Sequence, residues 1–255
     1  MIPIGDLWAR DSSAYGLYLR RSLGCSDDCC GIGDTSATLY YAASLVLALG
    51  QLHGFNILYR GISPERVFLS NTGALQLTGF KFSKHLPGRT YTLCGDTEYM
   101  SPEQIEGSGH GTSSDWWALG VMVYEMIYGR SPFAGKGNLT ELEIYSNITA
   151  YNNDLKWDDS ISVSDETKAF VQSAMNRDIS KRLNAISAYK DPWFLKGGVV
   201  WAKIAKGETT YTNKNEKVPL LDELSAMHVQ WKNDAMLPEG DVKTAVDDEE
   251  WFAEF

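Results

Sequence analysis

Cysteine thiols are the first side chains whose spacing suggests chemistry in this 255-residue chain. Cys25, Cys29 and Cys30 crowd together, and three thiolates could hold a zinc ion if a fourth ligand came from elsewhere. Adjacent cysteines do not have the paired spacing of common zinc sites, so the alternative is an exposed loop with reduced thiols. Cys94 lies alone. We therefore expect no metal site.

A glycine-rich loop that could cradle phosphate groups is the second candidate. Gly31-Ile32-Gly33 begins such a pattern, but the third glycine is absent and no strand precedes it. The local patterns therefore supply no phosphate-binding loop.

The composition narrows the class of protein. With 44% hydrophobic residues and eight Trp, the chain can bury one substantial core. The net charge of −10 argues against nucleic acid or an anionic membrane as the main partner, because phosphate contacts need clustered Lys and Arg, whereas basic peptides fit this charge. No apolar stretch reaches the length of a membrane-spanning helix, and the N-terminal residues lack a signal-peptide pattern. We expect a cytoplasmic protein.

Hydrophobic periodicity predicts a mainly helical fold with a small β hairpin. Apolar residues recur at helical spacing over 37–53, and residues 115–128 are apolar on nearly every face, which indicates a central buried helix capped by Ser113 or Ser114. Asn71-Thr72-Gly73 is a turn signal between two short strands. The predicted strands are 67–69 and 75–77, and the further predicted helices lie near 139–150, 165–177 and 180–189.

Several longer motifs resemble one family. Gly88–Glu103 resembles the activation and substrate-docking segment of AGC-group serine/threonine protein kinases, the cyclic-nucleotide-dependent kinases in particular. Asp115–Val121 resembles their central C-lobe helix, Pro192-Trp193-Phe194 the end of their kinase core, and Phe252–Phe255 the hydrophobic motif that closes the cAMP-dependent kinase. The motifs stand in the family's order. The resemblance implies a protein kinase-like fold.

The resemblance also implies how the chain is divided. Met1–Trp8 resembles the kinase hinge, so we expect the C-terminal lobe over 1–201 with the N-terminal lobe missing, and a loop-rich insertion over 10–36. Residues 202–255 match the AGC-type C-terminal tail. Because a kinase binds adenine between its two lobes, tight ATP binding is not expected.

Sequences that resemble the family's catalytic motifs are present, but the residues that carry out the chemistry are replaced. Tyr59–Arg66 resembles the kinase sequence His/Tyr-Arg-Asp-x-Lys-Pro-Glu-Asn, and Gly79-Phe80-Lys81 resembles Asp-Phe-Gly. Phosphoryl transfer needs one Asp to orient the acceptor, and an Asp and an Asn to hold magnesium. The residues at the altered positions are Gly61, Ser63, Arg66 and Gly79, with Asp96 in place of a supporting threonine. We therefore expect a pseudokinase without ATP or magnesium as cofactors.

Other family positions retain their residues. Arg60 and Lys84 match positions that pair with a phosphothreonine, here Thr92, and a phosphate there would order the loop. The alternative, equally open, is that Arg60 only packs and Thr92 is never modified. Three positions match residues with a structural role, namely the ion pair of Glu103 with Arg182 and the loop-binding carboxylate of Asp115.

A set of carboxylates implies a peptide-binding surface. The family grips arginines upstream of the phosphoacceptor at positions that here carry Asp6, Glu65 and Glu125, and carboxylates select arginine through bidentate hydrogen bonds. A small apolar pocket for the following peptide residue matches Leu93, Thr97 and Met100. The expected partner is a protein or arginine-rich peptide, such as a kinase regulatory subunit or inhibitor. The competing interpretation is that the carboxylates are inherited structural residues.

Two other functions stay open at this stage. One is a divergent or truncated serine/threonine kinase that transfers phosphate from ATP to protein with an N-lobe borrowed from another chain. The other is a truncated or decaying gene product without function, since Phe252–Phe255 has no N-lobe to dock on.

Overall fold

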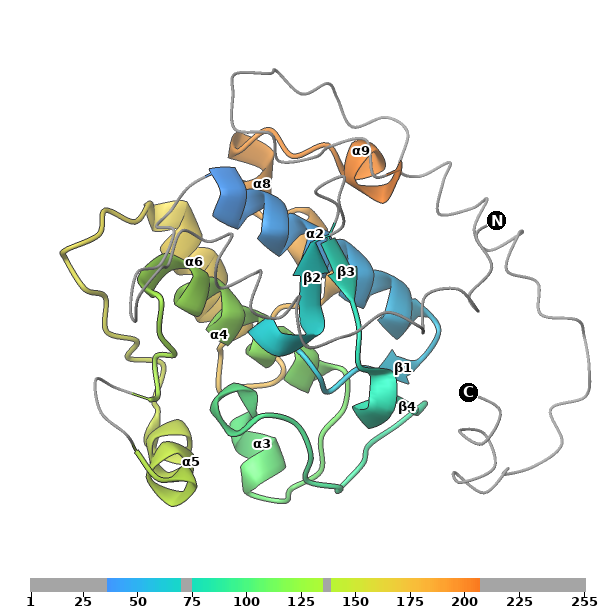
Figure 1. Ribbon diagram of the computed structural model, residues 1–255, viewed down its shortest axis with the longest axis vertical. Helices are drawn as coiled ribbons and strands as arrows, with labels where there is room; N and C mark the ends of the chain where they lie inside the picture. The colour runs from blue at the N-terminus through green and yellow to red at the C-terminus, as the bar shows by residue number, and fades with distance from the viewer. Residues whose placement is uncertain (1–35, 70–74, 135–138, 207–255) are drawn as a thin grey trace, which may run out of the picture. The chain divides into compact units, whose positions relative to one another are not determined.

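Two long apolar helices form the centre of the fold, as Figure 1 shows. The computed structural model describes residues 36–69, 75–134 and 139–206. Helix α2, Ser36–Gly54, packs against α4, Ser113–Tyr128, and both helices are buried over most of their length. Side chains that are apolar around the whole helix explain this burial. Both predicted helices are confirmed, α2 with its end at Gly54 and α4 with a left-handed Gly129 after its last turn.

Shorter helices surround this pair. Helix α6 packs on α4, whereas α7, α8 and α9 pack on α2 (Figure 1). Helix α5 is preceded by a capping box in which Thr140 and Glu143 bond each other's backbone N–H groups. The bounds of these helices are α3 Pro102–Ile105, α5 Glu141–Ala150, α6 Asp165–Ala174, α7 Ala185–Tyr189, α8 Pro192–Lys196 and α9 Trp201–Lys206.

The described residues also form two small antiparallel strand pairs. Strands β2, Val67–Leu69, and β3, Leu75–Leu77, form the predicted hairpin, with Val67 opposite Leu77. The predicted turn at 71–73 lies outside the described residues. A second pair, β1 (Ile57–Leu58) with β4 (Lys84–His85), was not predicted, because two-residue strands carry no alternation signal. The mainly helical fold with a small hairpin is confirmed.

Three single-turn 3-10 helices lie between these elements and carry candidate site residues. They are η2 Pro64–Arg66, η3 Phe80–Phe82 and η4 Thr97–Tyr99. The pairing of β1 with β4 brings the segment before η2 beside the segment after η3. Residues that are far apart in the sequence therefore meet around η2.

Some predicted helix limits are wrong. The N-cap of α4 is Thr112 and not Ser113 or Ser114, and the Ser114 hydroxyl instead donates to the Gly111 carbonyl over 2.8 Å. The helix predicted over 180–189 begins only at Ala185, because the Asn184 side chain caps it there. The preceding residues form a turn in which the Arg182 N–H donates to the Asp178 carbonyl. In such turns the side chains of Asp, Asn and Ser can bond to nearby backbone groups, and these bonds compete with the backbone hydrogen bonds of a helix.

The predicted insertion (10–36) lies outside the described residues except for Ser36, and the tail lies outside them from 207 onward. Helix α9 begins at Trp201 and continues past the predicted start of the tail at 202. Among the helices of the described ranges, none has the length and apolar character needed to cross a membrane.

Close packing of α2 on α7 depends on Gly50. A Cβ atom added at Gly50 would lie well inside contact distance of the Tyr189 hydroxyl and 3.1 Å from the ring carbon Cζ. The Tyr189 ring in turn packs edge-on against Trp201, with 4.9 Å between ring centroids. The absent side chain at Gly50 therefore sets how closely these helices approach.

We predict that Gly50→Ala destabilises the chain by about 1 kcal/mol or more, because the clash outweighs the roughly 1 kcal/mol that Ala gains over Gly in a helix. In a Tyr189→Phe background, which removes the hydroxyl, Gly50→Ala should be close to neutral. Chemical denaturation of the full chain measures both free energies of unfolding. Equal effects of Gly50→Ala in the two backgrounds would contradict this packing account.

Candidate functional site

The loop that leads into η2 is held by one buried carboxylate. Asp115, near the start of α4, accepts hydrogen bonds from the backbone N–H of Tyr59 at 2.9 Å and of Arg60 at 2.7 Å. His53 Nε2 also contacts Asp115 Oδ2 at 2.8 Å. Arg60 takes a left-handed backbone conformation, with φ of 56°. The structure thus places Asp115 in the loop-binding position that the resemblance implies.

Arg66 lies at the middle of the site and links two segments. Its guanidinium forms a bidentate ion pair with Asp96, with Nη2 donating to Oδ1 over 3.1 Å and Nη1 donating to Oδ2. Nη1 also donates to the Ser63 hydroxyl over 3.1 Å. Because η2 carries Arg66 and the activation segment carries Asp96, this ion pair ties the loop that resembles the kinase catalytic loop to that segment.

Two glycines make room for the Arg66 side chain. A Cβ atom at Gly79 would lie 3.0 Å from Arg66 Cδ, and one at Gly61 would lie 3.5 Å from the same atom. Gly79 also has a φ of 67°, which most other residues avoid. The altered catalytic positions therefore form one packed unit, which we call the Arg66 centre: Gly61, Ser63, Arg66, Gly79 and Asp96.

Aromatic and basic side chains border this centre. The Arg66 guanidinium carbon lies 4.8 Å from the centroid of the Phe82 ring, and Lys81 Nζ lies 4.8 Å from the same centroid. Each cation faces the electron-rich ring. Lys81 is exposed, whereas the Arg66 side chain is only 14% exposed.

The charge of Asp96 is stabilised by these neighbours. Partial burial alone would raise its pKa, but hydrogen bonds from Arg66 and Ser63 and the positive charges of Arg66 and Lys81 hold the pKa below its ordinary value. Asp96 is therefore ionised near neutral pH, and its carboxylate is engaged in the ion pair with Arg66.

The residues of the Arg66 centre do not fit the magnesium ions that the kinase family uses. Magnesium requires oxygen ligands, and the family positions that would supply them carry Gly61, Gly79 and a guanidinium. The nearby carboxylate, Asp96, already pairs with Arg66. More broadly, no group of three His, Cys, Asp or Glu side chains within the described ranges could hold a metal ion. Cys25, Cys29 and Cys30 lie outside those ranges.

Arg60 and the activation segment are connected through backbone groups. Arg60 Nε donates to the Phe82 carbonyl over 2.6 Å, while Nη1 is buried without a hydrogen-bond partner in the part of the chain that the structure describes. Thr90 and His110 exchange two backbone hydrogen bonds of 2.9 Å. Thr92 is exposed, and Lys84 pairs in β4 with Leu58. The segment is therefore anchored before the candidate phosphosite at Thr90, and after it at Asp96 through the ion pair with Arg66.

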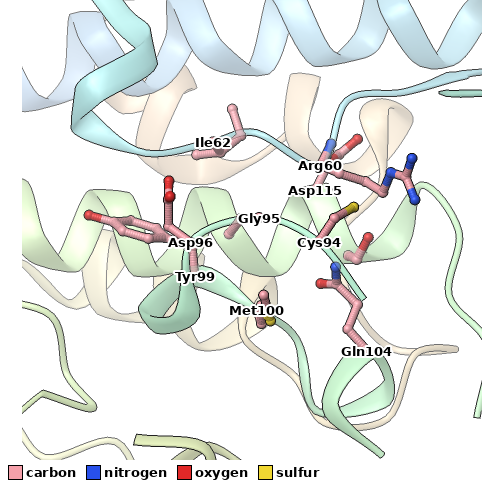
Figure 2. A pocket seen from close by; sticks show the side chains of 11 residues that line it. Arg60, Ile62, Cys94, Gly95, Asp96, Tyr99, Met100, Gln104 and Asp115 are labelled. Atoms are coloured by element: carbon pink, nitrogen blue, oxygen red, sulfur yellow. Dashed lines mark hydrogen bonds between the residues drawn. The ribbon is translucent and has the colours of Figure 1, made fainter. Parts of the chain in front are cut away.

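A narrow pocket lies between the loop, the activation segment and α4. Figure 2 shows Arg60 and Ile62 on one side of it and Cys94 and Met100 on the other. Burial raises the pKa of the Cys94 thiol, although the charge of Arg60 opposes the effect. This pocket is separate from the guanidinium of Arg66, which does not line it.

Carboxylates gather around a buried tyrosine. Tyr99 donates a hydrogen bond from its hydroxyl to Glu125. Burial, and after it the charges of Glu125, Glu65 and Glu98, raise the pKa of Tyr99 well above its ordinary value. We call Glu65, Glu98 and Glu125 the acidic cluster. Sequence reasoning missed Tyr99 and Glu98, although both stand in the activation-segment motif, and Asp6 lies outside the described residues.

The three residues of the predicted apolar pocket differ in exposure. Leu93 is 51% exposed, whereas Met100 is only 5% exposed and lines the narrow pocket beneath the loop. Thr97 is half-buried at the start of η4. Leu93 is thus the member that presents a wide apolar surface to a ligand.

A buried ion pair fixes the segment after the acidic cluster. Arg182 donates to both oxygens of Glu103, over 2.5 and 3.1 Å, and Arg182 is fully buried at its side chain. Arg182 also donates to the Ser113 carbonyl and lies over the Trp117 ring at 5.2 Å. This is the contact that the resemblance implies for Glu103 and Arg182.

We predict that Asp96→Asn lowers the free energy of unfolding at pH 7 by about 0.5–1 kcal/mol, the range of a partly exposed ion pair. A carboxylate whose pKa is lower in the folded state stabilises the fold above its unfolded pKa of about 3.9, and this contribution is lost as the pH falls through the folded value. The difference from wild type should therefore vanish near pH 2. Denaturation at both pH values measures it.

Asp159→Asn is the matched control, because Asp159 is exposed and lies far along the chain from Arg66. It should cost little at either pH. A cost of Asp96→Asn that does not change with pH would show that the ion pair with Arg66 is not its source.

Comparisons with known proteins agree with this geometry. The family model described as the protein kinase domain matches residues 30–194. A cAMP-dependent protein kinase, catalytic subunit-like, from Caenorhabditis briggsae is 35% identical over 196 residues, which cover 76% of this chain and 46% of that protein. The cAMP-dependent protein kinase catalytic subunit 2 of Drosophila melanogaster is 39% identical over 176 residues, covering 67% of this chain and 48% of the relative.

The cAMP-dependent protein kinase type 3 of Saccharomyces cerevisiae is 36% identical over 170 residues, covering 65% of this chain and 40% of that protein. The chain thus spans about half the length of the curated relatives that it matches. The matched region includes the Asp115 contacts, the Glu103–Arg182 pair and the Arg66 centre. On these grounds the chain belongs to the protein kinase family, with cAMP-dependent protein kinase catalytic subunits among its relatives.

Proposed function

We propose that this chain is a pseudokinase: a kinase-like module that has lost phosphoryl transfer and binds a basic segment of a protein partner. The observation that carries the proposal is the ion pair of Arg66 with Asp96 at the place where the family holds its metal ions. A guanidinium repels divalent cations, and its carboxylate partner is already neutralised.

The loss of catalysis extends beyond one residue. Transfer of a γ-phosphate needs carboxylates for magnesium and for the acceptor hydroxyl. Gly61 and Gly79 have no side chain to supply either group, and Arg66 packs tightly against Gly79. Supplying an N-lobe from another chain would not replace these groups.

The contacts that hold the lobe in shape are retained, which supports a use for the fold. Asp115 binds the loop backbone, and Glu103 pairs with Arg182. Neither contact requires catalysis. A partner-binding role uses the scaffold without its chemistry.

The acidic cluster supports a basic peptide as the ligand. Glu65 is exposed and Glu125 is half-buried beside Tyr99, and both stand at sequence positions that match those at which the family grips arginines. Two carboxylates can each take an arginine through paired hydrogen bonds. An arginine-rich inhibitor or regulatory subunit, met in the cytoplasm as part of kinase signalling, is the kind of partner we propose.

The purified full chain should transfer no phosphate from ATP to protein with magnesium or manganese. Radiolabelled γ-phosphate and a serine-containing basic peptide test this. Any signal has to be compared with that of the Asp96→Ala chain purified in the same way, because a contaminating kinase would give both the same signal. Transfer that is lost in Asp96→Ala would contradict the proposal and favour a divergent kinase.

Peptide binding is tested with a fluorescent peptide that carries two arginines upstream of a serine. We expect micromolar binding at low salt, and a loss of about tenfold or more for Glu125→Gln, because one bidentate arginine contact disappears. Replacing the peptide's arginines by lysines should weaken binding similarly, since lysine cannot form the paired bonds. Fluorescence anisotropy measures the affinities.

Two variants separate this effect from general damage. Tyr99→Phe removes the hydrogen bond to Glu125 but keeps the carboxylate, so binding should persist. Glu166→Gln removes one negative charge from α6, where Glu166 pairs with Lys196 on α8, and should leave binding unchanged. No binding by the wild-type chain, or equal losses in all three variants, would overturn the peptide-binding role.

A further inference from the structure

The substitutions in the Arg66 centre reverse the sign of its charge. The family pattern places two Asp and one Lys at these positions, a net negative charge that suits magnesium. Here the charged side chains are Asp96, Arg66 and the neighbouring Lys81, so one carboxylate stands beside two cations. A site with net positive charge attracts anions in place of cations. The sign reversal goes beyond a simple loss of metal ligands, which neutral residues would have achieved.

The positive charge is incompletely neutralised. Arg66 and Lys81 border the same Phe82 ring, each at 4.8 Å from its centroid. Asp96 forms its ion pair with Arg66. Lys81 forms no ion pair within the described residues and is exposed. An anion that contacts both cations would complete the neutralisation of their charge.

Hydrogen-bond donors remain available beside the vacated side-chain positions. The bonds to Asp96 and Ser63 use Nη1 and one N–H of Nη2 of Arg66, and Nε has no hydrogen-bond partner within the described ranges. Nε lies 3.5 Å from the place where a Cβ of Gly79 would stand. Arg66 Nε therefore lies beside the position where the family's metal-binding Asp would begin. Lys81 adds three further donors.

A phosphate monoester matches this set of donors. It carries close to two negative charges at neutral pH and three acceptor oxygens, which suit a guanidinium and an ammonium together. Glu65, the residue before Arg66, belongs to the acidic cluster, so negative and positive charge lie side by side. A ligand with arginines next to a phosphate fits both regions, whereas a nucleotide has only negative charge to offer.

We propose that the Arg66 centre, with Lys81, binds the phosphate of a phosphoserine or phosphothreonine in a basic peptide, without a divalent metal. The chain would then recognise a phosphorylated segment of the kind that an active kinase produces. This inference rests on the peptide-binding role proposed above, and it names the chemical form of the peptide.

The test compares two fluorescent peptides that differ only in phosphorylation of the serine after the arginines. Binding to the full chain is measured by anisotropy in buffer with EDTA. The phosphorylated peptide should bind about tenfold more tightly, as charge-assisted contacts to two cations predict. Lys81→Gln should reduce this preference to about twofold or less and leave the affinity for the unphosphorylated peptide unchanged. Lys190→Gln, an exposed charge in the turn after α7, should change neither affinity.

Asp96→Asn provides a change in the opposite direction. Removing the carboxylate that competes for Arg66 should increase the preference for the phosphorylated peptide, which a merely structural role of Asp96 would not do. ATP in EDTA should displace this peptide only at millimolar concentration. Displacement by micromolar ATP would overturn the assignment to a peptide phosphate.

The remaining outcomes separate the two proposals. Equal binding of both peptides would overturn the phosphate site while the peptide-binding role stands. A preference for the phosphorylated peptide that survives Lys81→Gln and does not rise in Asp96→Asn would also overturn it, because the phosphate would then be bound elsewhere. No binding of either peptide would overturn the peptide-binding role and the inference that rests on it.

Discussion

The ion pair of Arg66 with Asp96 is the interaction on which the rest of the site depends. A guanidinium that is 14% exposed needs a compensating carboxylate, because an unpaired charge at this depth is costly. Asp96 supplies it from the activation segment, and Ser63 accepts a further hydrogen bond. The residues of the centre are therefore consistent with one another. Asp96, which stands in place of a threonine in the family pattern, is the counterion of Arg66.

This arrangement differs physically from an active kinase centre. There, several carboxylates converge and repel one another until magnesium binds, so the order of the site depends on the metal. Here the charges compensate each other within the chain, and the link between loop and activation segment is a side-chain contact. Two other contacts hold the same segments: Asp115 binds the loop, and Glu103 of the activation segment pairs with Arg182. These contacts hold the two segments without a metal ion or a nucleotide.

Much of the fold could be predicted from the sequence, and the limits of that prediction have physical causes. Helices α2 and α4 and the β2–β3 hairpin follow from periodicity, because burial imposes it over many residues. The two-residue strands β1 and β4 and the late start of α7 depend on single contacts, which leave no periodic pattern.

The site divides in the same way. Family motifs indicated the contacts of Asp115 and the Glu103–Arg182 pair, since those positions are unchanged. They also indicated which catalytic groups are replaced. They could not indicate that Arg66 reaches Asp96, because 30 residues separate the two along the chain. Nor did they reveal Lys81 as a second cation on the Phe82 ring, because this contact depends on the conformation of η3.

The residues of the centre are coupled to one another by their geometry. A Cβ atom on Gly79 would lie 3.0 Å from Arg66 Cδ, so an Asp at this position would require the Arg66 side chain to shift by a few tenths of an ångström. A change of Asp96 back to threonine would in turn leave Arg66 without its counterion. Changing the centre to the family's catalytic residues would therefore involve several coupled positions at once.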